Sequence, residues 1–221
     1  MKRTKIKNRI LPDYTLGEEI FNAISHGIGI LLGIIVCILC ALKTKETPLV
    51  FIGCLVYGVS MIILYCFSTL YHSLPCGKGK KVLQILDHCT IYILIAGTYT
   101  PILLGGFLNA APTVCWILFG IQWGVSVIAI TLNAIDLHKF RYFSYFSYII
   151  LGWAIIFVCP IALRVLSPTA FLYILAGGIG YTIGAILYAI GNKHRWFHSI
   201  FHVFVVIGSI LQFIGIYCYI L

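Results

Sequence analysis

Charged residues are scarce in this chain. Only 10% of its 221 residues are charged, and aspartate and glutamate together number six, whereas 61% of the residues are hydrophobic. Side chains of this composition cannot give a folded protein the polar surface that water requires. The scarcity of charge excludes a soluble enzyme and a secreted soluble toxin, and it indicates a protein whose outer surface contacts lipid.

Polar linkers and low-complexity tracts are also absent, so nothing divides the chain into modules. A membrane-spanning helix needs about 20 mostly apolar residues, and seven such runs are present. They predict an all-α membrane protein, a seven-transmembrane-helix bundle that forms one domain over residues 1–221. We expect Gly105-Gly106 and the stretches 75–81 and 136–141 to be among the breaks that end helices. The predicted spans are 19–42, 49–72, 83–106, 112–134, 142–163, 168–190 and 197–221.

The nine cysteines do not suggest a disulfide framework. All except Cys76 lie in apolar runs, where cysteine acts as a small hydrophobic residue. Cys37 and Cys40 spell C-x-x-C, but no second pair accompanies them, so we interpret them as packing residues. The G-x-x-x-G pairs 29/33 and 180/184 predict close contacts between helices.

The net charge of +9 reflects membrane topology rather than nucleic-acid binding. Twelve of the fifteen lysines and arginines fall in the N-terminal tail and in the second, fourth and sixth predicted loops, whereas Lys43, Lys45 and Arg164 fall on the other side. By the positive-inside rule, the N-terminus is cytoplasmic and the C-terminus extracytoplasmic after seven spans. We therefore expect a multi-pass protein of the plasma (inner) membrane, with no nucleic-acid partner.

Polar side chains inside the spans gather at one predicted depth. Such side chains are costly in a membrane, so their positions are informative. Spans one, three and seven start on the cytoplasmic side, and span two ends there, which brings four polar clusters to the cytoplasmic ends of the helices. The clusters are Glu18, Asn22, Ser25 and His26; Ser68 and His72; Asp87 and His88; and His194, His198 and His202.

Three of these histidines predict a metal site. His198 and His202 are four residues apart and present two imidazoles on one helical face, a spacing that lets one cation bind both. His72 adds a third imidazole from another helix, and three histidines with an open fourth position are typical of catalytic Zn²⁺. Asp87 can hold a water molecule at such a site, and Ser68 lies one helical turn before His72.

The other histidines are weaker candidates. His138 and His194 adjoin basic residues and are expected to face solvent. His88 follows Asp87 directly and so should point about 100° away from it on a helix. His26 is either a group that supports the site or a packing residue, and the pattern does not decide between the two.

At these residues the sequence resembles the hemolysin III family, the bacterial branch of the progestin and adipoQ receptor family, which includes the adiponectin receptors. The resemblance rests on three motifs: Glu18-x-x-x-Asn22-x-x-Ser25-His26-x-x-Gly29; Ser68-Thr-Leu-Tyr-His72 followed by Leu86-Asp87; and His198-Ser-Ile-Phe-His202. It implies a seven-helix fold with a cytoplasmic N-terminus. It also implies zinc held by His72, His198 and His202, with Ser68 and Asp87 near the zinc-bound water.

Three functions compete for this pattern. The first is a zinc-dependent hydrolase of a lipid amide or ester, ceramidase-like by resemblance, with a membrane lipid as substrate and Asp87 as general base. The second is a lipid sensor in which zinc is a structural staple. The third is a pore-forming hemolysin, which would need more polar residues at mid-membrane than the scattered Gln122, Ser126, Thr182 and Gln212. The sequence favours the first and leaves the substrate and the oligomeric state open.

The charge asymmetry gives a testable topology. Alkaline phosphatase, which is active only outside the cytoplasm, should be active when fused after Leu221 and inactive when inserted between Pro75 and Lys81. Green fluorescent protein, which fluoresces only inside the cytoplasm, should give the opposite result at both positions. The reverse pattern of activities would show that the polar clusters lie on the extracytoplasmic side.

Overall fold

The computed structural model describes residues 4–191 and 194–221. Lys2, Arg3 and Lys193, which contribute to the charge argument, lie outside the described residues. Within the described part every regular element is helical. The long elements are α1 (Leu16–Thr44), α2 (Pro48–Ser73), α3 (Lys78–Pro101), α4 (Pro112–Asp136), α7 (Pro168–Gly191) and α8 (Phe197–Tyr219). The shorter ones are η1 (Ile6–Asn8), η2 (Ile102–Phe107), α5 (Arg141–Gly152), η3 (Ala154–Val158) and α6 (Cys159–Val165).

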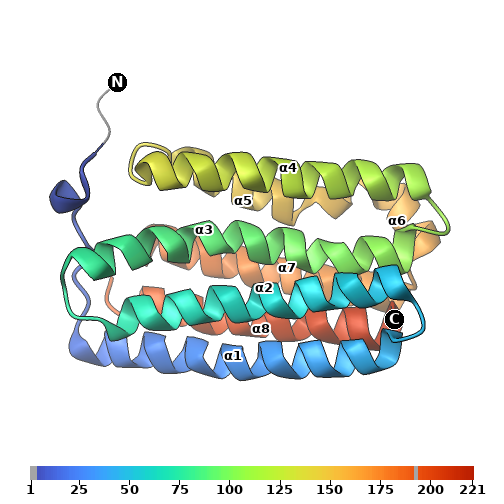
Figure 1. Ribbon diagram of the computed structural model, residues 1–221, viewed down its shortest axis with the longest axis horizontal. Coiled ribbons are helices and arrows are strands. Elements are labelled where there is room, and N and C mark those ends of the chain that lie inside the picture. The colour runs from blue at the N-terminus through green and yellow to red at the C-terminus, as the bar shows by residue number, and fades with distance from the viewer. Residues whose placement is uncertain (1–3, 192–193) are drawn as a thin grey trace.

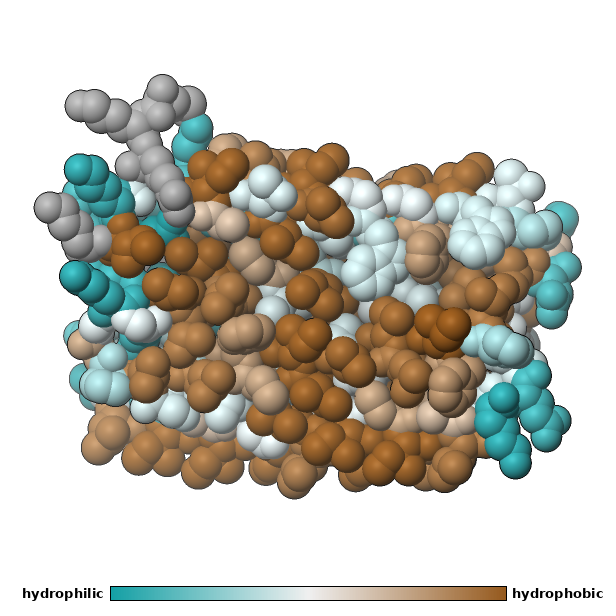
Figure 2. Space-filling view, in the orientation of Figure 1, coloured by the Kyte–Doolittle hydropathy of each residue, from teal (hydrophilic) through white to brown (hydrophobic). Residues whose placement is uncertain are grey.

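The helices run side by side in one bundle (Figure 1). Six are long and apolar enough to cross a membrane, and α5 with η3 and α6 makes a seventh if this bent pair is one span. The start of α1 and the C-terminus lie at opposite ends of the bundle. Figure 2 shows a broad hydrophobic band along the bundle and hydrophilic side chains at both ends. The arrangement confirms an all-helical membrane protein.

The first helix shows how sequence sets local structure. Thr15 begins α1 with a capping box, in which its hydroxyl accepts from the Glu18 backbone N–H and the Glu18 carboxylate accepts from the Thr15 N–H. The buried residues of α1 then recur every three or four positions, which gives one inward stripe. That stripe is polar near the start of the helix and apolar or small beyond it: Glu18, Asn22, His26, Gly29, Gly33, Val36, Cys40 and Thr44.

The third helix is the centre of the bundle. In its apolar stretch 72% of the residues are buried, against 28% in α1 and in α4. The predicted end at Gly105-Gly106 is slightly early, because a π-helical turn, η2, continues the helix through both glycines and ends at Phe107. The predicted loop 75–81 is also too long. The helix already begins at Lys78, and Lys80 is 3% exposed instead of being a solvated loop residue.

The predicted continuous span 142–163 is broken in the structure. Helix α5 ends at Gly152, a 3₁₀ segment follows, and α6 starts at Cys159, so that α5 and the segment 154–165 meet at 42°. Pro160 lies in the first turn of α6, where its missing N–H is tolerated, but it could not donate a bond within a continuous helix. Hydropathy alone does not report this bend.

Glycines set the distance between neighbouring helices, as the G-x-x-x-G pairs predict. A Cβ atom on Gly33 would lie 3.1 Å from the Ile62 backbone nitrogen of α2, and one on Gly180 would lie 3.5 Å from the Gly208 Cα of α8. Helices α1 and α2 also approach closely at Gly58, where a Cβ atom would lie 2.9 Å from the Cys37 backbone nitrogen. Backbone cannot yield as a side chain does, so this contact requires glycine.

We predict that Gly58→Ala destabilises the bundle by roughly 1–3 kcal/mol, because the added methyl overpacks the α1–α2 contact. Gly27→Ala is the matched control, since a Cβ atom there meets nothing within 4 Å and alanine is the better helix former. Unfolding in mixed micelles, followed by circular dichroism, measures the difference. Equal stability of the two variants would contradict the close contact.

Candidate metal centre

Three imidazoles meet at the end of the bundle where α2 ends and α8 begins. His72 lies in the last turn of α2, and His198 and His202 lie one turn apart at the start of α8. The Nε2 atom of His198 is 3.2 Å from Nε2 of His72 and 3.1 Å from Nε2 of His202. All three residues are buried, and their ligand atoms lie within 4.8 Å of one another. The predicted cluster of three histidines is therefore a single group that can hold a metal ion.

The donor set fits a tetrahedral ion. Imidazole nitrogens bound to zinc at 2.0–2.1 Å in tetrahedral positions are about 3.3–3.4 Å apart, close to the two Nε2 separations found here. The far nitrogens, Nδ1 of His198 and of His202, are buried and have no hydrogen-bond partner among the described residues. The three imidazoles point their Nε2 atoms at a common centre, where hydrogen bonds between them alone leave lone pairs facing one another. A shared cation would bind all three lone pairs.

A glutamate fixes the orientation of His72. Glu19 Oε2 lies 2.6 Å from His72 Nδ1, so Nδ1–H donates to the carboxylate and leaves the Nε2 lone pair facing the other two histidines. The Nδ2 atom of Asn22 also lies 3.4 Å from this Nδ1, but two donors cannot share a contact, so Glu19 decides the tautomer. Lys80 Nζ donates to the other oxygen of Glu19 at 2.7 Å and to the Leu74 carbonyl at 2.9 Å.

A second glutamate positions α8. Glu18 Oε1 accepts from the Trp196 backbone N–H at 2.7 Å. Its other oxygen accepts from the Thr15 backbone N–H in the capping box of α1. Trp196 precedes α8 and has a left-handed conformation with φ 67°, which is uncommon for a residue other than glycine. The same carboxylate thus joins the start of α1 to the start of α8, two residues before His198.

Two aromatic rings enclose the histidines. The His26 ring stacks on His202 with centroids 3.7 Å apart, which places His26 directly beside the cluster. The Tyr14 ring, from the N-terminal arm, stacks on His198 at 4.8 Å. Burial, and then the neighbouring Tyr71, Asp87 and Glu19, raise the pKa of Tyr14 well above its ordinary value, so its hydroxyl stays protonated.

A cavity of about 340 Å³ begins beside the cluster and runs into the bundle. At the cluster it is lined by His26, His198, Ser68, Asp87 and Tyr14, and its far wall includes Gln212. Gln212 is fourteen residues beyond His198 on α8, a rise of about 21 Å, so the cavity is long and narrow. The Thr98 and Thr182 hydroxyls on its wall donate to carbonyls of their own helices, which leaves the deep part mainly apolar.

Ser68 and Asp87 line the same cavity as His198. Ser68 Oγ is buried without a hydrogen-bond partner in the described structure, and it faces the cavity. Asp87 is partly exposed to the same cavity, with Oδ2 4.0 Å from His88 Nδ1.

The structure also shows where the other histidines and the polar residues at mid-membrane lie. His138 and His194 are exposed, as expected. His88 is closer to the site than predicted, because it lines the same cavity and its Nε2 lies 2.9 Å from the Tyr188 hydroxyl. At mid-membrane, Gln122 and Gln212 donate to backbone carbonyls of neighbouring helices, an arrangement that binds helices together.

Sequence reasoning missed Glu19, Lys80 and Tyr14. Glu19 had a usable signal, since it precedes Asn22 by three residues and His26 by seven and therefore shares their helical face. Lys80 had none, because it partners Glu19 across 61 positions. Tyr14 lies in an arm without regular structure, whose course no local pattern predicts.

Known proteins resemble this chain over most of its length. Residues 14–213 match the family described as Haemolysin-III related. The chain belongs to the hemolysin III family. It is 40% identical over 206 residues to a protein named Hemolysin-3 from Bacillus cereus, covering 92% of both chains. It is 38% identical over 208 residues to a Hemolysin-3 homolog from Bacillus subtilis (strain 168), covering 93% of this chain and 96% of that one.

A more distant relative confirms the wider resemblance. The Adiponectin receptor protein of Drosophila melanogaster is 27% identical over 189 residues, which cover 72% of this chain and 40% of the receptor. The match to a hemolysin III family and to a receptor of this kind agrees with the three motifs that surround the histidine cluster.

We predict that Glu19→Gln weakens metal binding by about 10- to 100-fold, because the neutral amide is a poorer partner for His72 Nδ1–H and leaves Lys80 without its anion. Titration of the purified protein with Co²⁺, followed by its visible absorption, measures the affinity. Glu46→Gln, an exposed change at the other end of the bundle, should leave the affinity unchanged. Unaltered Co²⁺ binding in Glu19→Gln would remove Glu19 from the site.

Proposed function

We propose that this hemolysin III protein is a zinc-dependent hydrolase of a lipid amide or ester at the cytoplasmic leaflet of the plasma membrane. The observation that carries the proposal is the opening of the histidine cluster onto a long apolar cavity with Ser68 and Asp87 on its wall. A purely structural metal needs no such cavity. Ligand sites of this size are mostly apolar with a few placed polar groups.

His72, His198 and His202 would hold the ion through their Nε2 atoms. Zinc in a three-histidine site leaves a fourth position open, lowers the pKa of water there to about 7 and polarises a carbonyl. Glu19 supports this role because its carboxylate accepts the Nδ1–H of His72. This contact makes the Nε2 lone pair of His72 a stronger ligand for the ion. His26 packs against His202 and holds that ring in place.

Asp87 is the group best suited to move the proton. It lies on the cavity wall with His198 and is only partly enclosed, so its carboxylate can accept a proton from water and pass it to the leaving amine or alcohol. Ser68, with its unpaired buried hydroxyl, can donate to the carbonyl oxygen as negative charge develops there. Tyr14 covers His198 from the arm and limits the access of bulk water.

The shape of the cavity supports a lipid substrate. Its apolar depth accepts a hydrocarbon chain, and its polar mouth lies beside the histidines, where the first carbonyl of an acyl group would come to rest. In this binding mode the scissile bond would lie at the boundary between chain and headgroup, at the depth that the charge pattern predicts for the cytoplasmic interface.

The decisive test is Asp87→Asn. The variant should keep its zinc, because Asp87 is not among the three imidazole donors, and should lose about 10²- to 10⁴-fold in rate. Detergent-solubilised protein is incubated with ceramides and other acyl lipids, and released fatty acid is scored by mass spectrometry. Zinc is measured by elemental analysis of the same samples.

Three controls complete the design. Glu46→Gln likewise replaces a carboxylate by its amide, at an exposed position at the other end of the bundle, and should hydrolyse at the wild-type rate. His72→Ala should lose both zinc and activity, whereas His138→Ala should lose neither. Hydrolysis by Asp87→Asn at the wild-type rate would contradict the mechanism and favour zinc as the staple of a lipid sensor.

A further inference from the structure

The far part of the long cavity contains a small group of polar side chains. Tyr181 of α7 and Gln212 of α8 line the cavity there, and Ser209 of α8 lies within hydrogen-bond distance of the Tyr181 hydroxyl. We name Tyr181, Ser209 and Gln212 the deep polar cluster. Ser209 and Gln212 follow His202 by seven and ten residues on the same helix, a rise of about 10 to 15 Å. The deep polar cluster therefore lies well inside the bundle, away from the histidines.

Gln212 offers an acceptor that has no partner. Its Nε2 atom donates to the Ile174 carbonyl of α7 at 3.0 Å. Because a carbonyl can only accept, this bond fixes which end of the amide faces Ile174. Gln212 is 6% exposed, and its Oε1 atom is buried without a hydrogen-bond partner among the described residues. A buried amide oxygen in a cavity wall favours a ligand that can donate to it.

Tyr181 offers a donor. Its hydroxyl lies 2.8 Å from Ser209 Oγ, and the Tyr65 hydroxyl lies 2.7 Å from the same atom. Three hydroxyl groups thus share two hydrogen bonds, which leaves one of their three protons without an acceptor in the described part of the chain. Tyr65 and Ser209 are fully buried, whereas Tyr181 lines the cavity. The network is therefore satisfied best when the Tyr181 hydroxyl donates to a group in the cavity.

Two glycines make room for the deep polar cluster. A Cβ atom on Gly177 would lie 2.8 Å from Gln212 Cγ, and one on Gly208 would lie 2.9 Å from Cδ1 of the Tyr181 ring. Each of the two polar side chains therefore packs over a residue without a side chain. Gly177 and Tyr181 are about one turn apart on α7, and Ser209 and Gln212 are about one turn apart on α8. The free donor and the free acceptor thus lie on adjacent turns of one helix pair.

We propose that the deep polar cluster binds a hydroxyl group on the hydrocarbon chain of the substrate, so that the protein selects acyl lipids with a hydroxylated chain. The inference rests on the proposed function in taking an acyl lipid as the occupant of the cavity. A chain hydroxyl accepts from Tyr181 and donates to Gln212 Oε1, whereas a methylene group pairs with neither. Sites built to bond a hydroxyl discriminate against the analogue that lacks it.

The position of the hydroxyl follows from the geometry. With the acyl carbonyl at the histidines, the deep polar cluster lies about 10 to 15 Å farther along the chain, by the helical rise from His202 to Ser209 and Gln212. This distance selects a hydroxyl near the middle of a long acyl chain. A hydroxyl next to the carbonyl would lie beside the histidines and would not reach Tyr181 or Gln212.

The test measures binding without turnover. Purified full-length protein in detergent is mixed with equal amounts of stearic acid and 12-hydroxystearic acid, and native mass spectrometry measures the ratio of the two bound forms. Wild type should prefer 12-hydroxystearic acid. Tyr181→Phe loses only a hydroxyl, and Gln212→Met keeps the length of the side chain but loses the amide. Each variant should lower the ratio by roughly two- to tenfold, the effect of one neutral hydrogen bond.

Two matched variants and one further ligand are the controls. Tyr99→Phe removes a hydroxyl from the same cavity wall, but that hydroxyl already donates to the Gly152 carbonyl and accepts from the Ile155 N–H. Gln122→Met removes an amide that donates to the Leu151 carbonyl away from the cavity. Neither should change the ratio. With 2-hydroxystearic acid in place of 12-hydroxystearic acid, Tyr181→Phe should not change the ratio either.

Equal binding of stearic and 12-hydroxystearic acid by wild type would overturn the proposal. An unchanged ratio in Tyr181→Phe or in Gln212→Met would also overturn it. The outcome is separate from that of the hydrolysis assay. A wild type that prefers the 12-hydroxy acid but hydrolyses no lipid would contradict the proposed function alone, and hydrolysis without this preference would contradict the role of the deep polar cluster alone.

Discussion

In a bilayer, an ionisable side chain is tolerated only where a partner or water meets it, and this constraint shapes one end of the bundle. Glu19 is the centre of that arrangement, because it binds His72 of α2 with one oxygen and Lys80 of α3 with the other. These contacts offset the cost of burying Glu19, His72 and Lys80 near lipid, and they also join the ends of three helices. They fix the imidazole orientation that a metal would need, so stability and the candidate site depend on the same contacts.

Helix packing explains why a cavity lies next to this cluster. Glycines allow α1 to approach α2 and α7 to approach α8 closely, so each pair packs backbone against backbone. The central helix α3 contributes Ile91, Leu94 and Thr98 to a cavity that α7 and α8 line from the other side. The broken segment α5–α6 borders the same space with Trp153. The cavity therefore lies between the central helix α3 and the closely packed pair of α7 and α8.

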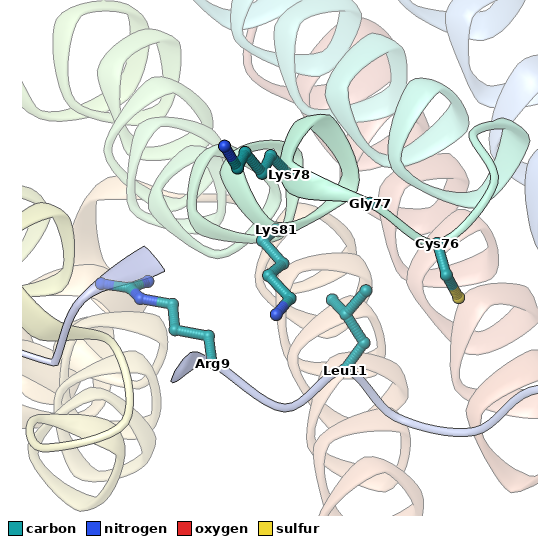
Figure 3. A pocket seen from close by; sticks show the side chains of 6 residues that line it. All are labelled: Arg9, Leu11, Cys76, Gly77, Lys78 and Lys81. Carbon is teal, nitrogen blue, oxygen red and sulfur yellow. The ribbon is translucent and has the colours of Figure 1, made fainter. Parts of the chain in front are cut away.

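The N-terminal arm runs from the start of α3 to the histidine cluster. Its Leu11 lines a hollow with Gly77 and Lys78 (Figure 3), Pro12 lines the long apolar cavity, and Tyr14 stacks on His198. Because the arm has no regular structure after η1, its position depends on these side-chain contacts.

The sequence by itself determined the helices and the depth of their polar groups. Runs of about 20 apolar residues specify spans, because only apolar side chains are stable against lipid. Successive spans run in opposite directions, which brings Glu18, His72, Asp87 and His198 to one level. Tertiary structure alone decided which way each side chain faces. The pairing of Glu19 with Lys80, the stacking of Tyr14 on His198 and the bend after Gly152 depend on how helices rotate and pack against one another. Hydropathy along one chain reports depth in the membrane, but it carries no information on rotation about a helix axis relative to its neighbours.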